Sequence, residues 1–108
     1  MPAVAVQITC FVDDHFPGFV ECQLIDAAGV THIFVEKVPV VTMEALRSTS
    51  PYPRPGVIGC EVLAQWEDPD GVGLSRIDTS KPWGIESNAG VAEFVVASSK
   101  IVRSWHDG

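Results

Sequence analysis

The sequence predicts a mainly β fold, organised as a small antiparallel β-barrel with one short helix after the third strand. Helical periodicity is nearly absent from the 108 residues, whereas runs of alternating apolar and polar side chains recur between turn clusters rich in Gly, Pro and Asp. About six such runs are joined mostly by short turns, which favours antiparallel pairing, and closure removes exposed sheet edges. An SH3-like or OB-like barrel is therefore expected, with a two-sheet sandwich as the next architecture. A chain of this length supports one core, so we expect a single domain over residues 1–108.

The first part of the chain is expected to form a three-stranded meander. Its strands are predicted over Val4–Val12, Phe19–Asp26 and Val30–Val38. Placing Cys10 opposite Cys22, and Cys22 opposite Ile33, puts the apolar side chains of all three strands on one face, as a single core requires. Pro39 should end the third strand, because proline has no N–H to donate to a ladder.

The rest of the chain is expected to hold the helix, a stiff connector and the remaining strands. In order, these are a helix over Thr42–Arg47, an extended proline-rich connector over 48–56, strands over Val57–Trp66, Val72–Thr79 and Val91–Ala97, and a short strand over Lys100–Val102. Thr42 suits a helix N-cap, and Arg47 suits the negative end of the helix dipole. Leu74 and Ile77 are three positions apart, so regular alternation would place these two apolar side chains on opposite faces of their strand. This indicates a bulge between them. Residues 80–90 read as a long loop.

The charge of the chain excludes two classes of partner. Seven Lys and Arg against fourteen Asp and Glu give a net charge of -7, and the basic residues are scattered. Binding to nucleic acid or to an anionic membrane requires clustered positive charge, so we expect neither. An acidic surface instead suits a basic protein partner. The simpler interpretation, that the charge keeps a small protein soluble, stands beside it.

The cysteines and the missing motifs predict a reduced, cytoplasmic protein without a cofactor. Cys10, Cys22 and Cys60 are an odd number without metal-ligand spacing, and all three are expected to face the core. No run approaches the roughly 20 apolar residues of a membrane span, and no signal-peptide pattern is present. No P-loop, dinucleotide fingerprint or Gly-x-Ser-x-Gly occurs, so nothing in the sequence points to catalysis.

Candidate binding residues lie on the meander face opposite the predicted core. In the predicted register Phe11, Glu21 and Phe34 form one cross-strand row, with His32 in the neighbouring row and Phe19 on the same face. Such a face should be polar if it is solvated. Three interpretations remain open: the helix and connector cover it, it is an interface with a partner or a second copy, or it holds a ligand.

Trp83 is the other candidate, because it lies in the long loop between Pro82 and Gly84. Loops on a rigid scaffold often carry function, although Trp83 is also a suitable plug for the open end of a barrel. The acidic turns at 13–14 and 67–68 lack calcium-loop spacing and are interpreted as solvated turns. The two turns would form one acidic surface if the fold brought them together.

These observations predict a non-catalytic binding module, an acidic cytosolic protein that docks on a basic protein as an inhibitor or immunity-type protein does. The first alternative is a small-molecule-binding or enzymatic barrel that uses the Trp83 loop. The second is a structural homodimer formed through the face that carries Phe11, Phe19 and Phe34.

Overall fold

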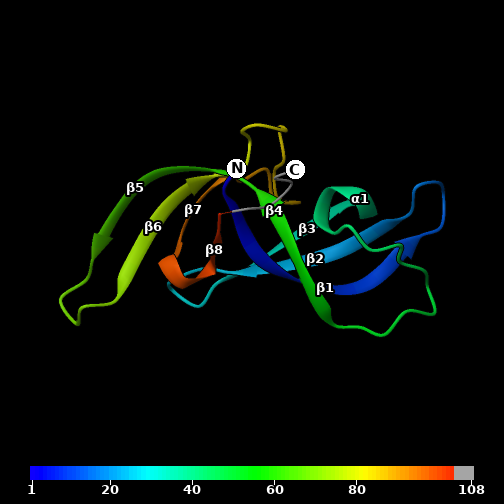
Figure 1. Ribbon diagram of the computed structural model, residues 1–108, viewed down its shortest axis with the longest axis horizontal. Coiled ribbons are helices and arrows are strands. Elements are labelled where there is room, and N and C mark those ends of the chain that lie inside the picture. Colours follow the sequence, from blue (N-terminus) through cyan, green and yellow to red (C-terminus); the bar gives the residue numbers. More distant parts are fainter. Residues whose placement is uncertain (104–108) are drawn as a thin grey trace.

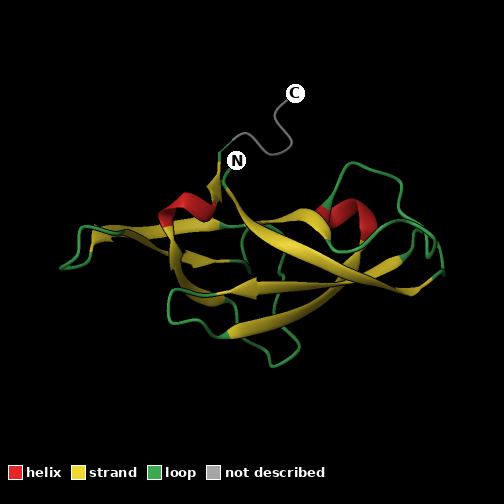
Figure 2. Cartoon of the chain, turned by 90° about the horizontal axis from the view of Figure 1, so that it is seen from below, coloured by secondary structure: helices red, strands yellow, loops and turns green. Residues whose placement is uncertain are grey.

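A computed structural model of the chain describes residues 1–103. The prediction of a mainly β fold is confirmed. The strands are β1 (Ala3–Asp13), β2 (Phe19–Ile25), β3 (Thr31–Lys37), β4 (Arg54–Gly59), β5 (Glu61–Glu67), β6 (Gly73–Asp78), β7 (Glu93–Ala97) and β8 (Ile101–Val102). They form two antiparallel sheets, called here sheet A (β3-β2-β1-β4, with β8 paired to β1) and sheet B (β5-β6-β7). Figures 1 and 2 show the arrangement.

The described residues contain no closed barrel, so the barrel prediction is not confirmed. Sheet A ends at β3 on one side and at β4 on the other. Helix α1 (Val38–Val41) contacts both of these edge strands. The two sheets share one hydrophobic core, in which the ring of Phe34 from sheet A lies 5.8 Å from the ring of Phe94 in sheet B.

The chain passes from sheet A to sheet B at Cys60. The sequence predicted one strand over Val57–Trp66, whereas the structure divides this run into β4 and β5, which diverge in Figure 1. The reason is local: the Cys60 N–H donates to the Pro2 carbonyl, and Cys60 itself is buried. β4 also begins earlier than expected, at Arg54, so part of the predicted connector is a strand that pairs with β1.

The register of the first hairpin differs from the prediction because β1 contains two irregularities. Ile8 lies opposite Cys22 and Phe11 opposite Val20, with register shifts between 8 and 10 and between 11 and 13. A bulge inserts one extra residue and reverses the alternation of side chains. The predicted Cys10–Cys22 pair is therefore wrong: Cys10 is exposed, while Phe11 packs against the core.

The second hairpin is shifted by one residue from the predicted register. Cys22 lies opposite Phe34 instead of Ile33. The turn explains the shift, because the Asp26 N–H donates to the Val30 carbonyl and the Asp26 carboxylate accepts the Val30 N–H, which makes these two residues the closing pair. Since side chains alternate along a strand, one step of register turns Phe34 into the core.

One short helix does follow the third strand, but it lies before the predicted segment Thr42–Arg47. Pro39 stands in the first turn of α1, where the missing N–H costs nothing. Thr42 ends the helix instead of beginning it, since its backbone is extended (φ -156°, ψ 156°) and its N–H donates to the Val38 carbonyl. A second short helix, η1 (Ser98–Lys100), follows β7. The expected bulge also moves, from Val72–Thr79 to β5 between Val62 and Ala64.

Candidate functional site

The predicted row of Phe11, Glu21 and Phe34 does not exist, because the two register changes separate its members. Phe34 is fully buried and contacts Phe94 in the core. The ring of Phe11 packs beneath Gly18, about where a side chain at that position would lie. Glu21 stays on the other face of sheet A, where its carboxylate accepts a 2.7 Å hydrogen bond from the Thr9 hydroxyl.

His32 lies near the start of β3, next to the turn that connects β2 and β3. Its Nε2 is 2.8 Å from the Asp26 carboxylate, and its ring meets the Phe94 ring edge-on at 4.7 Å. The hydrogen bond with His32, followed by those from the Val30 and Ala28 N–H groups, lowers the pKa of Asp26. Within residues 1–103 no hydroxyl or thiol is hydrogen-bonded to His32.

Replacing Asp26 with asparagine is expected to remove a pH-dependent part of the stability. The amide oxygen of Asn can still accept the two turn N–H groups, so the substitution isolates the charge beside His32. Because the pKa of Asp26 is lower in the folded protein, its contribution is complete above the unfolded pKa of about 4 and is lost as pH falls through the folded value. Urea unfolding at pH 7 and pH 3 measures this.

The stability difference between the wild type and Asp26→Asn should be larger at pH 7 than at pH 3. Asp70→Asn, which removes an exposed carboxylate from another turn, is the control. A difference that grows as the solution becomes more acidic contradicts the assignment.

The cysteines are not arranged as nucleophiles. Burial, with smaller contributions from Glu36 and Glu21, raises the pKa of Cys22 to about 12. Burial likewise raises the pKa of Cys60 to about 11. A thiolate is the reactive form of cysteine, so both side chains are small core residues, as expected. Cys10 is the exposed thiol of the described residues.

Sheet B has one face in the core and one face that no described element covers. Ser75, Ile77, Phe94 and Val96 are buried on the inner face. Because side chains alternate along β6 and β7, the neighbouring residues turn away from the core. We call the opposite side the open face. It is built from three cross-strand rows, of which the two outer ones have distinct chemistry.

The first outer row of the open face consists of carboxylates alone. Glu61 lies opposite Asp78, and Asp78 lies opposite Glu93. Like charges directly opposite each other destabilise a sheet. The Ser80 hydroxyl, and after it the Ser80 N–H, lowers the pKa of Asp78, which keeps this central carboxylate ionised. Lys81 Nζ is 3.8 Å from the Glu61 carboxylate. We call this set the acidic row.

The other outer row is apolar. Trp66 lies opposite Leu74, and Leu74 lies opposite Ala97. Trp66 is 41% exposed, which is high for so large an apolar side chain. The bulge after Val62 puts it there: without the extra residue, Trp66 would share the inner face with Val62. We call this set the apolar row; between the two outer rows lie Ala64, Arg76 and Val95.

The hairpin of β5 and β6 forms an arm that extends from one end of the molecule (Figure 1). Within the described residues β5 pairs with β6 alone. The segment 61–78 carries five acidic residues and one basic residue, more than half of the net charge of -7. Its tip is the expected turn, in which the Asp68 carboxylate accepts the N–H groups of Asp70 and Val72. The acidic turn at 13–14 lies at the other end in Figure 1, so the two turns do not form one surface.

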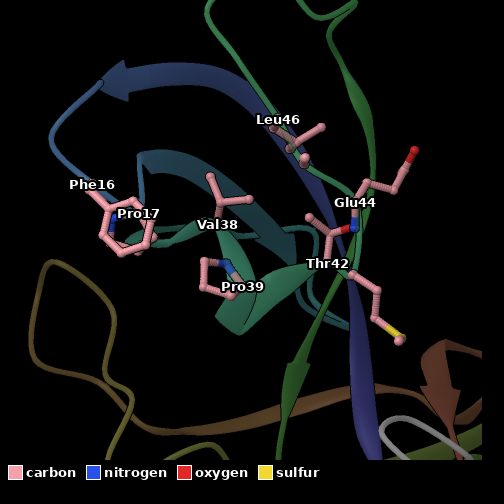
Figure 3. Close-up of a pocket in the computed structure, with 9 residues that line it drawn as sticks. Phe16, Pro17, Val38, Pro39, Thr42, Glu44 and Leu46 are labelled. Atoms are coloured by element: carbon pink, nitrogen blue, oxygen red, sulfur yellow. The ribbon is translucent and has the colours of Figure 1, made fainter.

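The sequence did not locate the pockets of the structure, two of which lie against β3 or the helix that follows it. The larger, about 500 Å³, lies beside α1 and is lined mainly by apolar side chains, including Phe16, Pro39 and Leu46 (Figure 3). Phe16 is 95% exposed at its rim. The smaller, about 260 Å³, brings together two predicted site residues, Phe19 and Trp83, from distant parts of the chain.

The described residues hold no group of three or more His, Cys, Asp or Glu side chains arranged for a metal ion. Neither of their helices has the length and apolarity needed to cross a membrane. The open face thus carries an apolar row and a negative row, separated by the row that contains Arg76. Comparison of the chain with protein-family models, with curated proteins and with solved structures finds no match.

Proposed function

We propose that the protein is a non-catalytic binding module that docks on a basic protein through the open face of sheet B. One observation carries this proposal: an uncovered sheet face carries both the acidic row and the apolar row, with the row of Ala64, Arg76 and Val95 between them. Interfaces of stable complexes combine an aromatic anchor with complementary charge around it. Trp66 supplies the anchor, and the acidic row supplies the charge.

The repulsion among the carboxylates of the acidic row favours a basic partner. Glu61, Asp78 and Glu93 repel one another in the free protein, where Lys81 lies near Glu61 and Arg76 stands in the adjacent row. Lys or Arg side chains of a partner relieve this repulsion, whereas a second copy of the chain brings the same carboxylates. The homodimer proposed through Phe11, Phe19 and Phe34 also loses its basis, since Phe34 lies in the core.

The arm gives the interaction an element that a partner stabilises. Within the described residues β5 is an edge strand of sheet B, and the open face of the arm has no covering layer. A partner that covers the open face extends the buried surface to Trp66 and Leu74. We place this interaction in the cytoplasm, where free thiols such as that of Cys10 persist.

Exchanging residues of the open face is expected to weaken capture of the partner. Trp66→Ala should weaken binding by at least about tenfold, because truncation of a central aromatic costs about 2 kcal/mol or more. Glu93→Lys should weaken it most at low salt, where charge attraction is least screened. The measurement is affinity capture from a lysate of the source organism, followed by titration of the protein recovered.

Matched substitutions at the other end of the molecule provide the control. Phe16→Ala and Asp14→Lys also remove an exposed aromatic and reverse a charge, but away from the open face. They should leave capture unchanged. The proposal is contradicted if these controls reduce capture as strongly as Trp66→Ala and Glu93→Lys, if the captured protein is not basic, or if nothing is captured at low salt.

A further inference from the structure

A pocket separate from the open face lies between β3 and the loop over residues 80–90. Its volume is about 260 Å³. The apolar walls are Phe19, Val35, Val40, Trp83 and Ile85. Two charged residues, Glu36 and Lys37, also line it. The loop runs along the outer edge of β3, where the Asn88 N–H donates a 2.8 Å hydrogen bond to the Ile33 carbonyl.

The walls of this pocket are held by contacts that leave little freedom to the loop. The buried Thr79 hydroxyl donates a 2.8 Å hydrogen bond to the Ile85 carbonyl, and the Ile85 N–H donates back to the Thr79 carbonyl. The Trp83 ring packs on Gly59, where a side chain would come within 2.9 Å of it. Trp83 is nevertheless 44% exposed, so part of the indole stays accessible.

Glu36 determines the charge that the pocket prefers. It is half-buried, and within residues 1–103 its carboxylate accepts no hydrogen bond and forms no ion pair. Burial raises the pKa of Glu36, whereas the charge of Lys37 acts in the opposite direction. A carboxylate removed in part from water gains from a cation beside it. The faces of aromatic rings attract cations as well, with Trp the strongest.

We propose that this pocket binds a small organic ammonium ion. The positive charge lies against Glu36, and the alkyl groups of the ion contact the rings of Phe19 and Trp83. Lys37 is exposed and lines the same pocket, where it repels the ligand. This site is independent of the docking surface proposed for sheet B, because the two share no residue.

Titration of the isotopically labelled full chain with tetramethylammonium chloride tests the site. Two-dimensional ¹H–¹⁵N spectra at constant ionic strength should show saturable shifts at the Trp83 indole N–H and at the amides of Phe19 and Glu36. The neutral analogue tert-butanol and the anionic analogue pivalate should bind at least about tenfold more weakly, since neither gains from the carboxylate. Equal or tighter binding of either analogue overturns the proposal, and so does the absence of saturable shifts.

Three substitutions of similar size separate the charge effect from damage to the fold. Glu36→Gln should weaken binding of tetramethylammonium about tenfold, whereas Lys37→Gln should strengthen it. Glu44→Gln removes a carboxylate that pairs with Arg54 outside the pocket, and it should change nothing. Each variant is compared only if its spectrum retains the dispersion of the wild type; Lys37→Gln tests the site even where Glu36→Gln does not fold. The proposal fails if Lys37→Gln weakens binding or if Glu36→Gln leaves it unchanged.

Discussion

Replacing Phe34 with alanine is expected to lower the free energy of unfolding by about 3–5 kcal/mol. Phe34 is the largest of the fully buried side chains, and its ring contacts Phe94 across the two sheets. Its removal leaves a cavity where sheet A meets sheet B. Domains of this size are stable by about 5–15 kcal/mol, so the loss is a large share of the total. Urea unfolding followed by circular dichroism measures it.

The neighbouring residue provides a control that also tests the register. Val35 points to the other side of β3 and is 37% exposed, so Val35→Ala should cost less than about 1 kcal/mol. In the register that alternation alone predicts, Val35 would lie in the core and Phe34 outside it. A larger loss for Val35→Ala than for Phe34→Ala would therefore show that the β2–β3 pairing is wrong.

Replacing Gly56 with alanine is expected to destabilise the protein by about 1–3 kcal/mol. Gly56 is a buried residue of β4 opposite Val6. A methyl group there would lie 2.8 Å from two side-chain carbons of Ile8 and 3.1 Å from the Val41 carbonyl oxygen. The Ile8 side chain is itself fully buried and has no room to move away. Urea unfolding at constant pH measures the change.

Gly73 is the matched control for this substitution. It also lies in a strand without a positive φ, but an added methyl group would make only ordinary contacts, the nearest at 3.4 Å from Ser98. Gly73→Ala should therefore be neutral or slightly stabilising, since alanine loses less backbone entropy than glycine on folding. Equal losses at both positions would mean that the close approach of α1 and β1 to β4 is not as described.

The approximate extent of most strands could be predicted from the sequence, although β4 and β5 were predicted as one strand, but the pairing of the strands could not. Alternation along Phe19–Ile25 shows that this run is a strand, because the pattern belongs to one segment. Pairing depends instead on how a turn closes. Asp26 closes its turn with Val30 through hydrogen bonds whose geometry the alternation does not reveal. One step of register then decides that Phe34 is a core residue and not a surface one.

Bulges have the same consequence for Phe11 and Trp66. Each lies beyond a register shift in its own strand. Its side chain therefore points to the face opposite to the one that regular alternation along the strand predicts. Nothing in the composition of β1 or β5 marks the extra residue. For Phe11 the shift removed a candidate from the predicted surface, and for Trp66 it created one.

The candidate surfaces were only partly accessible to sequence reasoning. The excess of acidic residues predicts a basic partner, and Trp83 with Phe19 was already a candidate. The positions of Glu61, Asp78 and Glu93 in one row depend on the pairing of three strands, and the two ends of that row are more than thirty positions apart in the chain. The pocket of Phe19 and Trp83 depends on the loop over 80–90 lying along the edge of β3.

By itself the sequence determined the class of the fold, the approximate strands and the sign of the charge; it predicted a short helix after the third strand but placed it over Thr42–Arg47 instead of Val38–Val41. These properties arise within short segments, from alternation, proline and glycine chemistry and composition. The tertiary structure alone decided that the sheets stay open, which aromatic rings enter the core and where the carboxylates gather. Those outcomes depend on hydrogen bonds between distant segments, and a single step in their pairing reverses the direction of every side chain in a strand.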